Sequence, residues 1–243
     1  MQRKQLLVGS LALAGVAGLG ASRAAGNAPL DEATAPNLGK SLNAPAKGYV
    51  KVAFVIGPQL VAIDLIGPFT VFGSADSVVP SGQGFDVYSV AETRSAYDLG
   101  DLFIQSRYTF DNAPRPNVIV VPQQAHSPAT IEYIRTSAQG ADVTLSVCTG
   151  AFLVGEAGLF DGGRATTHHA AYDRFAQRFP NVTLIRGPRY VEDPNVSSSG
   201  GESSGIDLSL RVVERYYGRA VADSVAYGME YRRTPRPASV SDV

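Results

Sequence analysis

Tryptophan is absent from this 243-residue chain, and cysteine occurs only once, as Cys148. A single cysteine cannot form an intramolecular disulfide, so the fold has to rest on its hydrophobic core. The chain also lacks CxxC, HExxH and glycine-rich phosphate-loop patterns, which argues against the metal and nucleotide sites that these motifs build. We therefore expect neither a metal ion nor another cofactor.

An excess of positive charge is missing as well. The chain has 21 basic and 22 acidic residues, and no stretch combines aromatic with basic residues as single-strand binders do. Loss of residues 1–24 would leave 18 basic against 22 acidic residues, a net charge near −4. This balance argues against a nucleic-acid partner and against an anionic membrane surface.

The one long apolar run lies at the N-terminus. It follows Arg3 and Lys4, extends over residues 6–19 with several glycines, and ends in small residues around Ala24. This pattern is typical of a secretory signal peptide, predicted over residues 1–24, and is too short and glycine-rich for a good membrane span. An uncleaved anchor is the alternative. We expect export to the periplasm or medium of a bacterium, with no membrane contact after cleavage.

The rest of the chain divides into three parts. Residues 25–47 are rich in Ala, Pro and Asn without an apolar period, which predicts a linker or a strap lying on the surface. Residues 48–231 have the length and apolar content of one α/β domain. Residues 232–243, with Arg232 and Arg233, are expected to be a loose, solvated tail.

Apolar strands alternate with helical segments throughout residues 48–231. Strands are predicted at 49–56, 85–91, 102–108, 117–121, 143–147 and 164–167, with a possible hairpin of 189–191 and 196–199. Helices are predicted after residue 61, from Ser127-Pro128, after Cys148, around Tyr172–Phe179, after Gly201 and over 219–231. In the first of these, Leu65, Phe69 and Phe72 are expected to fall on one face of the helix. The pattern predicts a flavodoxin-like, doubly wound and mostly parallel sheet flanked by helices.

Cys148 follows the strand 143–147 directly and precedes a run of small residues that favours a helix, beginning Thr149-Gly150. A strand, a cysteine and a helix in this order predict a nucleophile elbow, in which the next backbone N–H faces the reacting atom. The helix N-terminus is expected to favour the thiolate. The alternative is a buried structural cysteine.

Asp64 is embedded in the apolar sequence VAIDLIG. A carboxyl group in such surroundings tends toward a raised pKa, which suits a proton donor. An aspartate ahead of a short helix is also a common N-cap. The local sequence leaves both interpretations open.

Three blocks of sequence resemble the DJ/PfpI superfamily, and most closely its isonitrile hydratase-like branch: AIDLIGPFTVF, SVCTGAFLVGEAGLFDGGRATTHH and SSSGGESSGIDLSLRVVERYYG. The resemblance covers about residues 49–231. It implies that Cys148 is the nucleophile, that Asp64 handles the proton beside it, and that the Thr149 hydroxyl or N–H contacts the reacting group. It also implies that His168 lies near the cysteine, and it suggests a homodimer.

The chain departs from the family pattern in two places. Gln123 and Gln124 follow Pro122 where the family often has two glycines, and glutamine tolerates positive φ less well. His169 follows His168 where the hydratase branch usually has tryptophan. We count Gln123, Gln124, Gly150, His126 and His168 as candidate substrate-binding residues; the alternative for His126 is a solvated loop histidine.

The resemblance implies a cysteine-dependent hydro-lyase that converts an isonitrile and water to an N-substituted formamide. Two alternatives stay open. One is a redox sensor or holdase without turnover, in which Cys148 is oxidised to a sulfinic acid held by the carboxyl group. The other is a glyoxalase-like enzyme for α-oxoaldehydes, which Asp64 makes less favourable because that branch normally relies on a glutamate.

Overall fold

A computed structural model describes residues 39–233 of the chain. The predicted signal peptide, the linker up to residue 38 and the tail from residue 234 lie outside the described residues. Within residues 39–233, no helix is long and apolar enough to cross a membrane.

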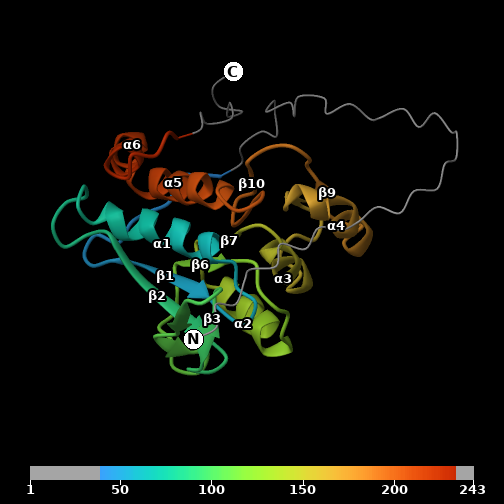
Figure 1. Cartoon of the computed structure of the whole chain (residues 1–243). Helices are drawn as coiled ribbons and strands as arrows, with labels where there is room; N and C mark the ends of the chain where they lie inside the picture. The colour runs from blue at the N-terminus through green and yellow to red at the C-terminus, as the bar shows by residue number, and fades with distance from the viewer. Residues whose placement is uncertain (1–38, 234–243) are drawn as a thin grey trace, which may run out of the picture.

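A seven-stranded sheet forms the middle layer (Figure 1). Its strands, in spatial order, are β10 (Tyr190–Glu192), β11 (Val196–Ser199), β7 (Val143–Ser146), β6 (Val118–Val121), β1 (Val50–Val55), β2 (Phe85–Ala91) and β5 (Tyr108–Thr109). All neighbours pair in parallel except β10 and β11, which are antiparallel. The predicted flavodoxin-like sheet is confirmed, and the hairpin expected around Pro194 is present.

Helices cover both faces of this sheet, as Figure 1 shows. One face carries α1 (Ala62–Ala75), α5 (Ser204–Tyr217) and α6 (Arg219–Gly228). The other carries α2 (Pro128–Ala138), α3 (Gly150–Glu156) and α4 (Tyr172–Arg178), the last preceded by the 3-10 turn η1 (His169–Ala171). Two small pairs of strands lie outside the main sheet: β3 (Ala96–Asp98) with β4 (Phe103–Gln105), and β8 (Arg164–Ala165) with β9 (Thr183–Leu184).

The central strand β1 shows why the sheet has two covered faces. Val52 and Phe54 point into the core under α1 and α5, whereas Ala53 and Val55 point into the core under α2 and α3. Because successive side chains alternate between faces, a strand buried on both sides reads as a continuous apolar run. The strand predicted from YVKVAFVI is therefore confirmed as β1.

The predicted start of α2 and the predicted end of α5 are confirmed. Ser127 is the N-cap of α2: its Oγ accepts a hydrogen bond from the Thr130 N–H at 3.5 Å and donates one to Glu92 at 2.8 Å. Gly218 ends α5 in a left-handed conformation, φ 85°, which a residue with a side chain rarely adopts.

Two element predictions are wrong. The strand expected at 102–108 is broken at Ser106, which is buried and donates a hydrogen bond to the Thr93 carbonyl, so β4 pairs with β3 and only β5 joins the main sheet. Phe69 does not share the buried face of Leu65 and Phe72; it is 41% exposed. The buried stripe of α1 passes through Pro68, and at 100° per residue Phe69 lies on the stripe's solvent side.

The C-terminal segment also differs from expectation. Helix α6 ends at Gly228 rather than at residue 231, and the chain turns back so that the Tyr231 hydroxyl donates a hydrogen bond to Asp207 at 3.0 Å. Arg233 is not a solvated side chain: it is 13% exposed, pairs with Asp223 at 2.8 Å and also contacts Glu214. Arg233 therefore does not belong to a solvated tail.

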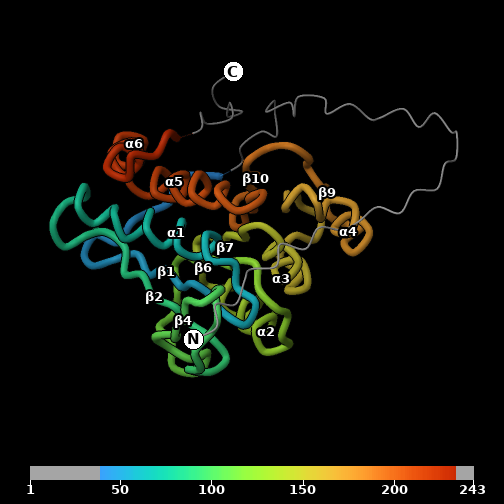
Figure 2. Tube along the Cα trace, in the orientation of Figure 1, coloured from blue at the N-terminus to red at the C-terminus, as the bar shows by residue number. Residues whose placement is uncertain are grey.

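The described part of the predicted strap lies along α5. The Leu42 N–H donates to the Arg215 carbonyl at 2.7 Å, and the guanidinium groups of Arg211 and Arg215 donate to the carbonyls of Gly39 and Lys40 at 3.1 and 2.8 Å. Figure 2 shows α5 and α6 side by side, with the chain before β1 passing near them.

Candidate active site

The polypeptide turns sharply at Cys148, between β7 and α3. Its φ is +58°, a left-handed conformation that costs about 1 kcal/mol or more for a residue with a side chain. The surroundings hold it there: the Cys148 N–H donates to the Gly200 carbonyl at 3.1 Å, and its carbonyl accepts from the Thr167 hydroxyl at 2.9 Å. This is the geometry of a nucleophile elbow.

Gly150 makes the elbow possible by its lack of a side chain. A Cβ at this position would lie 2.1 Å from the Val121 carbonyl oxygen and 2.8 Å from that of Pro122. Helix α3 can therefore start directly against the end of β6. Gly150 is buried against this backbone, so the structure gives it a packing role at the turn.

Asp64 lies on the inner side of the first turn of α1 and is fully buried. Its Oδ2 accepts a hydrogen bond from the Gln123 N–H at 3.3 Å, and the carboxyl group also interacts with the Cys148 side chain. Among the described residues, Oδ1 has no hydrogen-bond partner. The N-cap of α1 is Val61, so the capping interpretation of Asp64 is wrong.

Burial is the largest cause of the unusual proton affinity of Asp64. It raises the pKa of the carboxyl from 3.8 to about 7, against the Gln123 hydrogen bond, and the negative charge of Glu202 raises it further. This is the raised pKa that the apolar sequence around Asp64 predicts. Near neutral pH the group exchanges a proton readily, as a general acid and base must.

The thiol of Cys148 does not rest as a thiolate. Burial raises the pKa of the thiol to about 11, and the charge of Asp64 raises it as well; the N–H groups of Thr149 and Glu202, which point at the sulfur, act in the opposite direction. The expectation of a thiolate favoured by the helix N-terminus is wrong here, because a 7% exposed sulfur beside a carboxylate loses more from desolvation than it gains from two N–H groups.

The two glutamines of the loop after β6 have different roles: Gln124 holds the loop to β1, and Gln123 contacts Asp64. Gln124 is buried, and its amide donates to the Val55 carbonyl at 2.8 Å. Gln123 supplies its N–H to Asp64 and its side-chain amide to the Gln59 carbonyl at 3.0 Å. Neither glutamine has positive φ; Gln59, in the facing loop, does. The loop therefore presents an N–H without the glycines of the family pattern.

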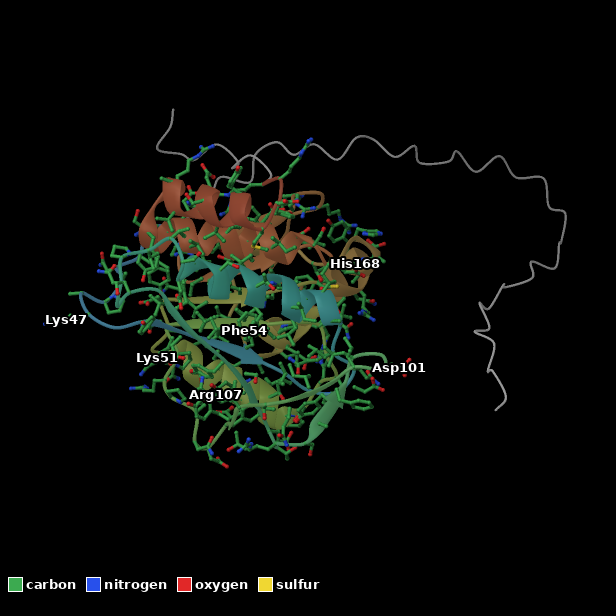
Figure 3. The ribbon with its side chains drawn as sticks, turned by 60° about the vertical axis from the view of Figure 1, so that its left-hand side comes forward. Lys47, Lys51, Phe54, Asp101, Arg107 and His168 are labelled. Atoms are coloured by element: carbon green, nitrogen blue, oxygen red, sulfur yellow. The ribbon has the colours of Figure 1, made fainter. Side chains whose placement is uncertain are left out.

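An open cleft of about 730 Å³ lies against the elbow on the side of β11. Thr167 and Gly200, both hydrogen-bonded to the Cys148 backbone, form part of its wall. We call it the Glu202 cleft; its other walls include His168, His169, Tyr172, Arg189 and Glu202. Figure 3 shows His168 at the end of the molecule toward which the arrow of β1 points, opposite Lys47.

His168 is fixed by its neighbours. Its Nδ1 accepts a hydrogen bond from the Ala170 N–H at 3.2 Å, and its ring lies against that of His169 in a tilted arrangement, with centroids 4.2 Å apart. A side chain at Gly201 would collide with the ring, since a Cβ there would lie 2.2 Å from Cδ2. These contacts place His168 beside Gly201 on the wall of the Glu202 cleft, and its expected position near the cysteine stays a prediction.

A second, smaller pocket of about 370 Å³ opens on the Thr149 side of the elbow. We call it the Arg174 pocket; its lining residues are Gln123, Gln124, His126, Thr149, Phe152, Arg174 and Arg178. The Nδ1 of His126 lies 3.2 Å from a Glu156 oxygen, and Arg174 stacks over the Phe152 ring at 4.6 Å. His126 thus lines a pocket while remaining partly solvated.

Sequence reasoning missed the part that β11 and its following turn contribute. The sequence around Glu202 indicates only an acidic residue near a helix N-terminus, where it would be stabilising, yet its N–H reaches the sulfur. The signal was the block SSSGGESSG after a predicted strand, because carboxyl ends of parallel strands meet at one edge of a sheet. Among the described residues, no three potential ligand side chains group to hold a metal ion.

The sequence matches the DJ-1/PfpI family over residues 50–215. The chain belongs to the DJ-1/PfpI family. Isonitrile hydratase from Pseudomonas putida is 32% identical over 193 residues, which are 76% of this chain and 80% of that protein. A THiJ/PfpI family protein from Pseudomonas syringae has 27% identity and a TM-score of 0.67, over 79% of both chains.

Other DJ-1/PfpI relatives are transcriptional regulators. The HTH-type regulator CdhR from Pseudomonas aeruginosa is 31% identical over 105 residues, 43% of this chain and 31% of the regulator. Drosophila melanogaster DJ-1beta shares the fold, with a TM-score of 0.64 at 16% identity over 75% of this chain. The family thus accommodates enzymes and regulators on one scaffold.

Proposed function

We propose that the protein hydrates isonitriles to N-substituted formamides, with Cys148 as nucleophile and Asp64 as proton carrier. The observation that carries this proposal is the pairing of a buried thiol with a buried carboxyl that has no cationic partner among the described residues. The similarity to an isonitrile hydratase over most of both chains supports it.

The proton inventory of this pair suggests the order of events. Between pH values of about 7 and about 11 the pair holds one proton, which rests mainly on sulfur. As the sulfur attacks the isonitrile carbon, the proton passes to the Asp64 carboxylate, and Asp64 then delivers it to the same carbon. The product of these steps is a thioimidate bonded to Cys148.

Water completes the reaction. It adds to the thioimidate carbon, one of its protons goes to nitrogen, and the other returns to sulfur as the carbon–sulfur bond breaks. An N-substituted formamide leaves, and the thiol and carboxylate are restored. The N–H groups of Thr149 and Glu202 face the sulfur, so they stabilise negative charge that develops there.

Conversion of an alkyl isonitrile by the purified protein tests the proposal. We expect formamide to form, and Cys148→Ala to lose at least about 10³-fold in kcat, because the covalent step is removed. Ser209→Ala, a change at a small buried residue of α5, is the matched control and should keep the wild-type rate. A Cys148→Ala protein with wild-type turnover would contradict the mechanism.

Redox sensing is the competing function. The structure makes it less favourable, because a 7% exposed thiol with a pKa of about 11 presents little thiolate to peroxide. Complete oxidation of Cys148 to a sulfinic acid by two equivalents of peroxide, read from the intact mass, together with no isonitrile turnover, would favour the sensor instead.

We also propose that the protein is a homodimer. Ile63, Ile66 and Phe69 lie on the outer side of α1 and are 39%, 48% and 41% exposed, which is an apolar stripe that a second copy can cover. Ile66→Lys should convert a dimer to a monomer in light scattering; an unchanged mass would place the contact elsewhere.

A further inference from the structure

The Glu202 cleft and the Arg174 pocket flank the elbow, and they differ in charge. The Glu202 cleft is the larger, about 730 Å³ against about 370 Å³. That volume lies within the usual range for small-molecule sites. Thr167 and Gly200, which bond to the Cys148 backbone, line the Glu202 cleft. Thr149, the residue after Cys148, lines the Arg174 pocket.

Among the described residues that line its cleft, Glu202 is the acidic residue, and it has no ion-pair partner there. The other ionised residue of the wall, Arg189, is neutralised by Asp207, whose side chain is 1% exposed. Glu202 is exposed and has no ion-pair partner within residues 39–233. Its charge is felt at the site, since it raises the pKa of both Asp64 and Cys148.

Aromatic rings line the same cleft. Tyr172 accepts a hydrogen bond from the Gly187 N–H at 2.9 Å, and its ring already carries the Arg186 guanidinium at 5.2 Å from the centroid. The rings of His168 and His169, which lie against each other in a tilted arrangement, form the neighbouring wall. A carboxylate beside aromatic faces is the combination that recognises organic cations.

The backbone at Glu202 is strained, with φ at +43° directly after two glycines. Glycine would adopt this conformation without cost, whereas a glutamate there costs on the order of 1 kcal/mol. Such strain is typical of positions where the side chain has a function.

We propose that substrate reaches Cys148 through the Glu202 cleft and that Glu202 selects a substrate with a cationic substituent, such as an ammonium-bearing isonitrile. The cation lies beside the Glu202 carboxylate and the aromatic wall, while the reactive carbon meets the sulfur. The choice of an isonitrile rests on the proposed function; the charge preference of the route to the thiol does not.

The single cysteine gives a test that needs no turnover. Two thiol reagents of similar size, a trimethylammonium-ethyl and a sulfonatoethyl methanethiosulfonate, modify only Cys148, and the intact mass follows each rate. Relative to a free thiol, we expect the wild-type protein to favour the cationic reagent by roughly three- to tenfold, as one partly exposed charge implies. Glu202→Gln should reduce this preference to about one.

Glu230→Gln is the matched control, because Glu230 is also an exposed glutamate with positive φ, at 52°, and lies after α6. It should leave the preference unchanged. Equal preferences in wild type and Glu202→Gln would overturn the proposal. So would faster reaction of the anionic reagent that Arg174→Gln reverses, since access would then be through the Arg174 pocket.

Turnover then tests the substrate class. Dimethylaminopropyl isonitrile and its neutral isostere, isohexyl isonitrile, differ by one protonated nitrogen. The ratio of their kcat/KM values should exceed about three in the wild type and fall to about one in Glu202→Gln. A ratio of one in the wild type contradicts cation selection. Absence of any turnover contradicts the proposed hydratase but leaves the reagent test valid.

Discussion

Asp64 and Glu192 are both carboxyl groups buried in the same domain, but their surroundings are opposite. Glu192, 2% exposed on β10, pairs with Arg211 at 2.9 Å and Arg215 at 3.6 Å. Asp64 is fully buried and has a backbone N–H and a thiol as neighbours, with no cation among the described residues. A buried carboxylate that stabilises a fold is paired with cations. A buried carboxyl group that transfers protons is left without a cation, and its pKa is shifted toward the working pH.

The largest effect should come from Asp64→Asn. This change keeps the shape of the side chain but removes its proton exchange, so isonitrile turnover should fall by about 10²- to 10⁴-fold. The measurement is kcat at neutral pH. Turnover within a factor of a few of the wild type would remove Asp64 from the mechanism and end its contrast with Glu192.

Glu192→Gln should have the opposite outcome. Removal of the charge leaves Arg211 and Arg215 buried with less compensation, and the free energy of unfolding should fall by about 3 kcal/mol. Turnover per folded molecule should stay near the wild-type value, because Glu192 does not contact the site. Denaturant unfolding and active-site titration of Cys148 measure the two quantities separately.

The pH dependence of stability should separate the two carboxyl groups again. The folded-state pKa of Asp64 is raised from 3.8 to about 7, so the folded protein binds this proton more tightly than the unfolded chain. Its contribution to the free energy of unfolding is fully present below pH 3.8 and is lost as pH rises to about 7. This loss amounts to at most about 4 kcal/mol. Asp64→Asn should therefore gain stability relative to wild type across this window in parallel denaturant titrations.

The rate of turnover should follow the same titration with opposite sign. Below a pH of about 7 both members of the pair are protonated, and Asp64 cannot accept the thiol proton. We expect kcat/KM to fall about tenfold per pH unit on the acid side and to level off above it. A rate independent of pH between 5 and 8 would contradict the shared proton.

The smallest effect should come from Arg233→Gln, which removes the guanidinium group that pairs with Glu214 and Asp223. Its side chain is 13% exposed and joins the C-terminal segment to α5 and α6. Loss of these pairs should cost about 1 kcal/mol in unfolding free energy and leave turnover unchanged. Urea unfolding of the full chain provides the measurement.

The sequence predicted the parts of the site that local patterns determine. The apolar run, Cys148 and the following Thr-Gly predict the elbow, and the apolar surroundings of Asp64 predict its raised pKa. The raised pKa of the Cys148 thiol could not be predicted in the same way, because the burial of Cys148 depends on how β11 and α1 pack around it. The side of α1 on which Phe69 lies likewise depends on the rotation of that helix against the sheet.

The positions of charged residues in the fold were the other part that the sequence did not predict. Arg233 reads as a tail residue until the turn after α6 brings it to Glu214. Glu202 reads as a helix-terminal acid until the order of strands places β11 beside β7. Both errors arise because charged side chains carry no periodicity that reveals their partners.

The hydrogen bonds from Arg211 and Arg215 to residues 39 and 40 have a practical consequence for labelling the protein. These arginines lie seven and eleven residues beyond the first residue of α5, about 10 to 16 Å along its axis from the end beside Cys148. An affinity tag or fluorophore joined before residue 39 therefore meets the domain at a distance from the thiol. Such a fusion can be immobilised through a point of the domain that lies away from Cys148.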